Sequence, residues 1–167
     1  MALAVGIGYD SHRFGAGRRL ILGGVEVPHE LGLEGHSDAD VLTHAVIDAI
    51  LGAAGLGDLG AHFPASDERW RDADSIDLLR TALGMVPGRV VNADATVICE
   101  GPRLEGHRAE MERELGAVLS APVTVKATSN EGMGWIGRNE GMACIAVVLV
   151  DLAAGEARTA AETSAGG

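Results

Sequence analysis

Aromatic side chains, cysteines and positive charge are all scarce in this chain of 167 residues. Aromatic residues make up 3% of the sequence, so small and aliphatic residues have to supply most of a core. Such a core is thin, and association of several copies would bury more apolar surface. No uninterrupted apolar run approaches the roughly 20 residues of a membrane helix, so we expect no membrane partner. The N-terminal residues lack the basic and apolar regions of a signal peptide, which predicts a cytoplasmic protein.

The two cysteines, Cys99 and Cys144, lie in apolar stretches, which favours buried free thiols over a disulfide or a metal pair. The formal net charge is −11, and no local basic patch offsets it. Because such a chain repels polyanions, we expect no nucleic-acid partner. An acidic protein that binds a phosphorylated ligand has to use cations, helix N-termini and backbone N–H groups, so the charge also favours a bound metal ion.

The apolar pattern predicts one domain over residues 1–152, with an α/β (α+β sandwich) fold in which helices cover one face of a mixed sheet. The segment 153–167 is rich in Ala, Glu, Thr and Gly, and we expect a disordered tail there. A helix is expected from a cap at Ser37 or Asp38 to about Ala54. The other expected elements are a strand at 2–10, a hairpin or bent strand pair at 19–27, a helix at 74–85, a strand at 90–99, a helix at 104–119, a strand at 123–127, a tight turn at 132–137, and a strand at 142–151 that is buried on both faces.

Asp10 and His12 form the first polar cluster, at the expected end of the first strand. On an extended chain, residues i and i+2 point to the same side, so this carboxylate and this imidazole can reach one ion together. A structural explanation is open as well, with Asp10 bonded to the local backbone and His12 half-exposed. The pair by itself is therefore a weak signal for a metal site.

A second polar cluster repeats every four residues, at His36, Asp40, His44 and Asp48. This spacing predicts a shared helix face, which would start at the helix N-terminus, where free N–H groups and the dipole favour an anion. Two histidines and Asp10 would give three ligands and one open position, as in catalytic zinc sites. His44, inside the helix, suits the metal, and His36, at its start, suits a phosphate. The spacing leaves the alternative pairing open.

The third cluster is a glycine-rich turn that follows Lys126 and carries Thr128, Ser129 and Glu131. Hydroxyls, backbone N–H groups and a carboxylate suit a diphosphate held through a hard divalent cation. Glycine-rich turns with Ser, Thr and Asn are also common without any ligand, so the turn taken alone supports both interpretations.

Taken together, these motifs resemble the 2-C-methyl-D-erythritol 2,4-cyclodiphosphate synthase family. The resemblance extends to about Leu152 and implies a homotrimer with active sites between adjacent subunits. It implies cyclisation of 4-diphosphocytidyl-2-C-methyl-D-erythritol 2-phosphate, in which the 2-phosphate attacks the β-phosphorus and CMP leaves, as a step of non-mevalonate isoprenoid synthesis. The motifs that carry it are GYDSHRF at 8–14, LILGGV at 20–25, GHSDADVLTHA at 35–45, LGDLGAHFP at 56–64 and KATSNEGMGWIGRNEG at 126–141.

The resemblance also implies two divalent ions. A zinc-type ion would be held by Asp10, His12 and His44, and Mg²⁺ or Mn²⁺ would join the α- and β-phosphates to Glu131. Attacking and leaving groups are both phosphates, so the protein supplies no nucleophile. Its work would be to position the phosphates and to neutralise charge on a five-coordinate phosphorus.

His36 and Ser129 would be the catalytic donors to the transition state. The other substrate contacts implied by the resemblance surround the methylerythritol, the phosphates, the cytosine and the central channel of the trimer. They are Asp10, His12, Ser37, Asp58, Gly60, Phe63, Asp67, Cys99, Gly101, Pro102, Arg103, Glu105, Thr128, Glu131, Trp135 and Arg138.

Three positions depart from the family pattern: Ser129 stands where Thr is usual, Trp135 where Phe is usual, and Ala65 where an acidic residue is often found. Serine keeps the hydroxyl group of threonine, so the departure at Ser129 changes only the packing of the side chain. Two other functions are compatible with the same residues. One is a non-catalytic sensor of phosphorylated metabolites, and the other is a phosphohydrolase that uses a zinc-bound water.

Overall fold

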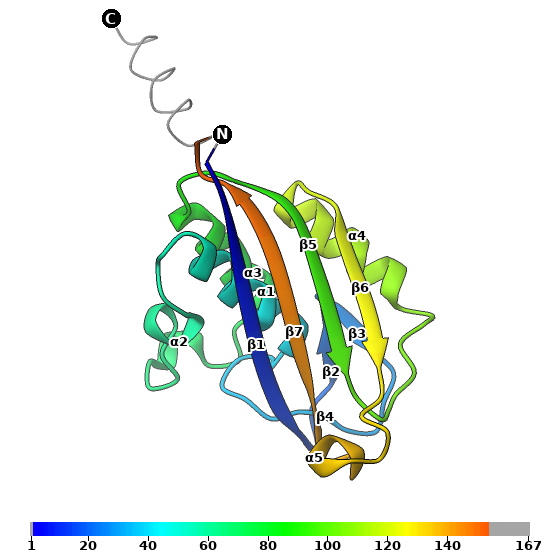
Figure 1. Ribbon diagram of the computed structural model, residues 1–167. Helices are drawn as coiled ribbons and strands as arrows, with labels where there is room; N and C mark the ends of the chain where they lie inside the picture. Colours follow the sequence, from blue (N-terminus) through cyan, green and yellow to red (C-terminus); the bar gives the residue numbers. More distant parts are fainter. Residues whose placement is uncertain (1, 154–167) are drawn as a thin grey trace, which may run out of the picture.

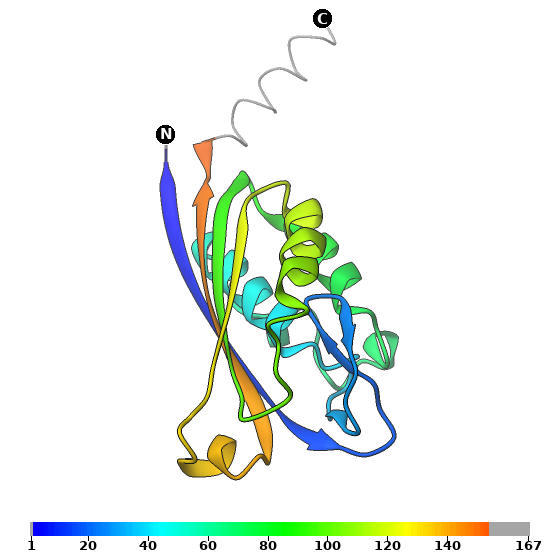
Figure 2. The same cartoon turned by 90° about the vertical axis from the view of Figure 1, so that its right-hand side faces the viewer.

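The computed structural model describes residues 2–153 and contains a five-stranded mixed sheet (Figure 1). The helices α1, α3 and α4 lie on one side of this sheet (Figure 2), where α1 and α4 pack on the strands and α3 packs on these two helices, which confirms the predicted α/β layers. The strand order is β4-β1-β7-β5-β6, and a separate two-stranded hairpin, β2-β3, lies outside the main sheet. Apart from Ala153, the tail predicted to be disordered at 153–167 lies outside the described residues.

Five strands build the main sheet: β1 (Leu3–Gly15), β4 (Gly32–Leu33), β5 (Arg89–Ile98), β6 (Val123–Thr128) and β7 (Gly141–Asp151). The long β1 pairs antiparallel with β7 from Leu3 opposite Asp151 to Arg13 opposite Gly141. Because of this pairing, β1 continues past its predicted end at Asp10. The predicted strand end at Asp10 is therefore too early, since Asp10 and His12 both lie inside β1. On its other side β7 pairs antiparallel with β5, and β5 pairs in parallel with β6.

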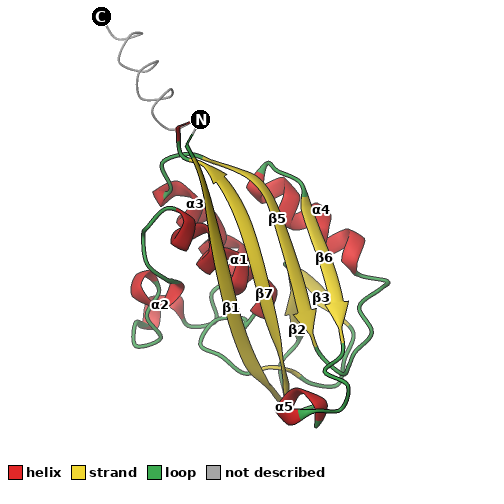
Figure 3. Ribbon diagram, viewed as in Figure 1, coloured by secondary structure: helices red, strands yellow, loops and turns green. Residues whose placement is uncertain are grey.

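Of the two predicted alternatives for 19–27, the hairpin is confirmed: β2 (Leu20–Leu22) pairs antiparallel with β3 (Val25–Val27). Gly23 and Gly24 both have positive φ, at 60° and 75°, which is the backbone that a tight two-residue hairpin turn requires. The helical segments are α1 (Val41–Ala53), α2 (Leu59–His62), η1 (Glu68–Trp70), α3 (Ser75–Met85), α4 (Arg108–Leu119) and α5 (Gly134–Gly137), drawn in red in Figure 3.

Helix α1 begins at Val41, later than the predicted cap at Ser37 or Asp38. Asp40 is the N-cap, and its carboxylate accepts a backbone N–H of the first turn. Ala39 has φ of 59°, a left-handed backbone that a helix cannot continue through, so the earlier caps are excluded. Two other boundaries also differ from the prediction: α4 begins at Arg108 and the predicted tight turn at 132–137 contains α5.

Two glycines of β1 allow α1 to lie directly against the strand. A Cβ atom at Gly6 would meet the carbonyl oxygen of Ala49 at 1.8 Å, and one at Gly8 would meet that of Ala45 at 1.9 Å. Only a residue without a side chain permits this approach. The backbone contact positions the first turn of α1 beside the next residues of β1.

The sheet face that points away from the helices is apolar and exposed in the single chain. It carries Ile7 at 71% exposure, with Ile145 and Val147 of β7 beside it at 39% and 42%. The prediction that the last strand is buried on both faces is therefore wrong for one chain. The other large apolar residues exposed on β1 are Leu3, Val5 and Tyr9. Among the helices of residues 2–153, none combines the length and hydropathy needed to cross a membrane.

Candidate metal centre

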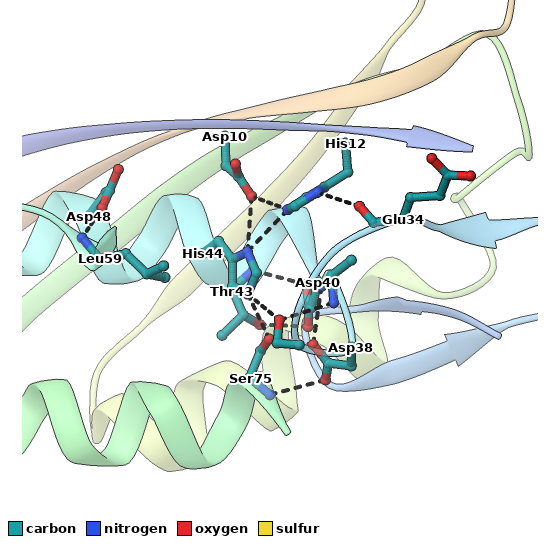
Figure 4. Close-up of polar contacts among 12 residues, drawn as sticks. Asp10, His12, Glu34, Asp38, Asp40, Thr43, His44, Asp48, Leu59 and Ser75 are labelled. Atoms are coloured by element: carbon teal, nitrogen blue, oxygen red, sulfur yellow. Dashed lines mark hydrogen bonds and ion pairs between the residues drawn. The ribbon is translucent and has the colours of Figure 1, made fainter. Parts of the chain in front are cut away.

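Three side chains converge between β1 and the first turn of α1 (Figure 4). Asp10 Oδ2 lies 2.9 Å from His12 Nε2 and 3.0 Å from His44 Nδ1, and the two histidine nitrogens are 3.3 Å apart. The three ligand atoms lie within 4.8 Å of one another and can hold a metal ion. Of the two histidines between which the spacing leaves a choice, the structure places His44 beside Asp10 and His12.

Hydrogen bonds determine which nitrogen of each histidine ring faces this cluster. His12 Nδ1 lies 2.8 Å from the carbonyl oxygen of Glu34, which accepts its proton, so Nε2 is the ring nitrogen that faces Asp10 and is available as a ligand when an ion replaces its proton. His44 has the opposite arrangement: its Nε2 lies 2.8 Å from Ser75 Oγ, and its Nδ1 faces the carboxylate. A carboxylate oxygen and two imidazole nitrogens are a common donor set for zinc.

The charges within the cluster also favour a cation. Burial disfavours the charged form of Asp10, but the hydrogen bonds from His12 and His44 outweigh it and lower the pKa of this carboxyl well below its ordinary value. Burial likewise disfavours protonated His12, yet the hydrogen bond to Asp10 dominates and raises the pKa of His12. Asp10 is therefore an anion that draws positive charge to this point.

Asp40 caps the N-terminus of α1 and joins it to the β2-β3 hairpin. This residue is fully buried at 0% exposure, and its carboxylate accepts the N–H groups of Gly23, Gly24 and Thr43 at 2.9, 2.8 and 2.9 Å. Of these three donors only Thr43 belongs to the helix, so the anion site predicted at this helix end stays a prediction. The predicted four-residue stripe is broken, since His36 and Asp40 precede the helix.

A cavity of about 170 Å³ opens beside the metal ligands. The side chain of His36 reaches it, with Nε2 3.1 Å from the carbonyl oxygen of Asp67. Trp70, which the sequence reasoning missed, packs edge-on against Phe63 with ring centroids 5.1 Å apart. A lone aromatic residue in a charged stretch gives no signal of a pocket. The lining residues are Asp10, His12, His36, Ser37, His44, Leu59, Phe63, Ala65, Trp70 and Leu78.

A second cavity, of about 320 Å³, shares Asp10 and His44 with the first. The predicted substrate residues Asp58 and Gly60 line it. Asp48, on α1, also lines it and accepts the N–H of Leu59 at 2.7 Å, which ties α1 to the first residue of α2. Burial raises the pKa of Asp48.

The glycine-rich turn lies after β6, at the other side of the sheet. Ser129 Oγ donates to Glu131 Oε1 at 2.8 Å, and Glu131 has a positive φ of 53°. Glu100, at the end of β5, accepts the N–H groups of Asn130 and Gly132 at 2.9 and 3.2 Å. The sequence reasoning missed Glu100, because nothing in the local sequence indicates that this carboxylate meets backbone groups some thirty residues further along the chain.

The segment predicted to bind cytosine adjoins this turn. Cys99 donates its N–H to the carbonyl oxygen of Thr128 at 3.0 Å, since β5 and β6 run in parallel and end together. Both cysteines are buried and free, as predicted, and burial raises the pKa of the Cys99 thiol to about 11. The predicted contacts in this segment are Cys99, Gly101, Pro102, Arg103 and Glu105.

Within one chain, the metal cluster and the turn are separated. The cluster stands on β1 and the turn follows β6, and both β7 and β5 lie between these strands. Trp135 and Arg138 belong to a third place, around α5 at one end of the sheet. Trp135 lines a cavity of about 260 Å³ together with His12, and Arg138 pairs with Glu140 at 2.7 Å.

Comparison with known proteins gives consistent matches. The model of the YgbB family matches residues 3–151. The 2-C-methyl-D-erythritol 2,4-cyclodiphosphate synthase of Symbiobacterium thermophilum is 51% identical over 154 residues, which cover 89% of this chain and 98% of that protein. The synthase of Rubrobacter xylanophilus is 55% identical over 159 residues, or 90% and 96% of the two chains. A solved structure of a 2C-methyl-D-erythritol-2,4-cyclodiphosphate synthase in a CDP-bound form matches with a TM-score of 0.80 and 35% identity, over 88% of this chain and 99% of that one.

Proposed function

Because the chain belongs to the YgbB family, whose model it matches over residues 3–151, we propose that Asp10, His12 and His44 form the zinc-binding half of its active site. The chain catalyses the conversion of 4-diphosphocytidyl-2-C-methyl-D-erythritol 2-phosphate to 2-C-methyl-D-erythritol 2,4-cyclodiphosphate, with release of CMP. It is a phosphorus–oxygen lyase of the non-mevalonate route to isoprenoid precursors. The convergence of three ligand atoms is the observation that carries the proposal for zinc.

The donor set fits a zinc-type ion, since it offers Asp10 Oδ2, His12 Nε2 and His44 Nδ1 and leaves one position for a phosphate oxygen. A second ion, Mg²⁺ or Mn²⁺, suits Glu131, whose exposed carboxylate is a hard oxygen ligand. When bound, the two ions polarise the β-phosphate and spread charge over the α- and β-phosphates.

The residues of the chain position the two phosphates against each other. A bond forms between an oxygen of the 2-phosphate and the β-phosphorus, and the bond from that phosphorus to the bridging oxygen of CMP breaks. His36 and Ser129 would donate hydrogen bonds to the oxygens on which charge develops, and removal of one such donor typically costs about 10²–10³ in rate. Correct orientation of an intramolecular attack contributes up to roughly 7–11 kcal/mol.

We assign the remaining substrate contacts to three regions. The first lies around the two cavities beside the metal cluster, where the methylerythritol phosphate would bind. The second is the segment after β5 with the turn after β6, where cytosine and the diphosphate would bind, and the third is α5, near the central channel of a trimer. The proposed contacts are Ser37, Asp58, Gly60, Phe63 and Asp67 in the first region, Cys99, Gly101, Pro102, Arg103, Glu105 and Thr128 in the second, and Trp135 and Arg138 in the third.

The proposed active site needs a second copy of the chain. The metal cluster and the turn with Glu131 are separated by two strands in one chain, so one substrate would be bound by the cluster of one copy and the turn of its neighbour. The exposed apolar face formed by β1 and β7, which includes Ile7 and Val147, is the surface on which copies would associate. We propose the homotrimer on these grounds, with a single domain over residues 1–152 that works in the cytoplasm.

The reaction is tested by ³¹P NMR after the CDP-ester substrate is incubated with the protein, Zn²⁺ and Mg²⁺. The proposed function predicts a cyclic diphosphate and one CMP for each substrate consumed. A linear phosphate product would instead indicate a zinc-dependent phosphohydrolase, and binding of substrate without any CMP would indicate a sensor. Omission of Mg²⁺ and Mn²⁺ should slow the reaction while zinc stays bound.

A further inference from the structure

His44 meets a hydroxyl group on the side of its ring that faces away from the metal cluster. Its Nε2 lies 2.8 Å from the Oγ of Ser75, the first residue of α3 (Figure 4). Ser75 is fully buried at 0% exposure, so no bulk water competes for this contact. The contact joins the two helices α1 and α3 directly behind the ligand atom.

The hydroxyl of Ser75 has a fixed direction because Asp38 lies behind it. Asp38 Oδ1 accepts the Ser75 hydroxyl proton in a short hydrogen bond, and Asp38 Oδ2 accepts the Ser75 backbone N–H at 3.0 Å. A carboxylate only accepts, so the single hydroxyl proton of Ser75 is directed at Asp38. Towards His44 the Ser75 oxygen can then only accept, so Nε2 carries a proton and Nδ1, which faces the cluster, is the ring nitrogen left to bind a metal ion when one is present.

Ser37 offers a second, longer acceptor to the same ring nitrogen. Its Oγ lies 3.1 Å from His44 Nε2 and also accepts the N–H of Ala39 at 3.2 Å. The contact from Ser75 to His44 Nε2 is shorter, at 2.8 Å, and the Ser75 hydroxyl is oriented by the Asp38 carboxylate. We therefore assign the control of the ring to Ser75.

We propose that Ser75 and Asp38 are positioning residues that hold the ring of His44 in the orientation and tautomer that a metal ion needs. The inference rests on the proposed zinc site and adds to it two residues that touch neither substrate nor ion. His12 gives the contrast, since its distal nitrogen is held by a backbone carbonyl, that of Glu34, which no substitution removes. Groups that accept a hydrogen bond from the second ring nitrogen of a metal-bound histidine typically raise metal affinity by roughly 10–100-fold.

The test measures zinc binding to Ser75→Ala by competition with a zinc chelator. We expect a dissociation constant raised by roughly 10–100-fold, because the ring of His44 loses its acceptor. The Co²⁺-loaded variant should show an altered d–d absorption spectrum, which reports ligand geometry and not protein stability. Asp38→Asn is the second variant, in case Ser75→Ala does not fold, and it should weaken zinc binding in the same direction.

Thr43→Val is the matched control. Thr43 is also a buried hydroxyl that donates to a buried carboxylate, Asp40 Oδ2 at 2.7 Å, in the same turn of α1. This variant should lose stability but keep zinc affinity and the cobalt spectrum. Wild-type zinc affinity in a folded Ser75→Ala or Asp38→Asn protein would overturn the inference. Lack of zinc binding by the unmodified protein would instead contradict the zinc site itself, so the two failures are distinguishable.

Discussion

The metal cluster and the turn with Glu131 are held in place by different means. His44 is 7% exposed, stands on a helix packed against the sheet, and has hydrogen-bond partners on both ring nitrogens. Glu131 is exposed on a turn, and the carboxylate of Glu100 holds the N–H groups on either side of it. A side chain fixed by the core keeps its direction without a ligand, whereas one on an exposed turn depends on a few hydrogen bonds. We infer that the cluster is preorganised for one ion, whereas the position of Glu131 depends on the hydrogen bonds that Glu100 accepts.

The largest effect is expected from removal of a ligand in the preorganised cluster. His44→Ala removes one of the three metal ligands, so the purified protein should no longer contain stoichiometric zinc. Its kcat should fall by more than about 10²-fold, which exceeds the loss typical for removal of a hydrogen-bond partner of a metal ligand. Elemental analysis after gel filtration measures the zinc, and the protein should elute as the wild type does. Full zinc retention would show that the helix histidine is not a ligand.

The exposed sheet face provides the next test. Ile7→Glu places a charge where 71% of the side chain is exposed in one chain, so the fold should persist while association fails. Sedimentation should give the mass of one chain, and activity should disappear with the oligomer. Met85→Glu is the control, since Met85 is also exposed, at 39%, but lies on α3 in the other layer. An Ile7→Glu protein of wild-type mass would show that copies meet elsewhere.

The contact between β1 and α1 predicts a smaller effect on the cluster. Gly8→Ala places a Cβ atom 1.9 Å from the carbonyl oxygen of Ala45, so the helix has to move and stability should fall by about 1–3 kcal/mol. Zinc affinity should fall as well, because His44 moves with the helix. Gly52→Ala lies in the same contact, but its Cβ would meet only Ile7 O at 3.9 Å, so it should raise stability by roughly 0.5–1 kcal/mol. Chemical denaturation measures both, and equal stabilities would refute the close approach.

The smallest effect is expected at the turn. Glu100→Ala removes the acceptor of two backbone N–H groups, and the Mg²⁺ or Mn²⁺ concentration for half-maximal activity should rise severalfold, up to about tenfold. In Glu100→Gln an amide oxygen can accept the same two bonds, so its metal titration should stay close to that of the wild type. If Glu100→Gln were as impaired as Glu100→Ala, the charge of Glu100 and not its hydrogen bonds would matter.

Local patterns predict more of this molecule than long-range contacts do. The apolar spacing of α1 and α3 and the glycine pair between β2 and β3 are local signals, and the structure agrees with them. The alternation of Asp10 and His12 also placed both side chains on one face. The N-cap residue of α1 is not predictable from local sequence, because the Asp40 carboxylate is held in place by hydrogen bonds from N–H groups of the distant β2-β3 hairpin.

The partners behind the site were beyond sequence reasoning for the same reason. Asp38 meets Ser75 on another helix, and Glu100 meets a turn after the next strand, with no spacing rule that links either pair. The exposed face of β7 is not predictable from its residues, because a continuous apolar run has the same appearance whether or not the chain itself covers its second face. Contacts that join separate segments therefore account for most of what local patterns do not predict.

A mixed oligomer tests most directly whether the cluster of one copy works with the turn of another. His44→Ala and Glu131→Gln, each inactive alone, are co-expressed with different affinity tags, and oligomers that carry both tags are purified. In a trimer that carries both variants, one of the three interfaces combines an intact cluster with an intact turn, so about one third of wild-type activity should return. Activity no higher than that of either parent would contradict the account, because both halves of the site would then have to come from the same copy.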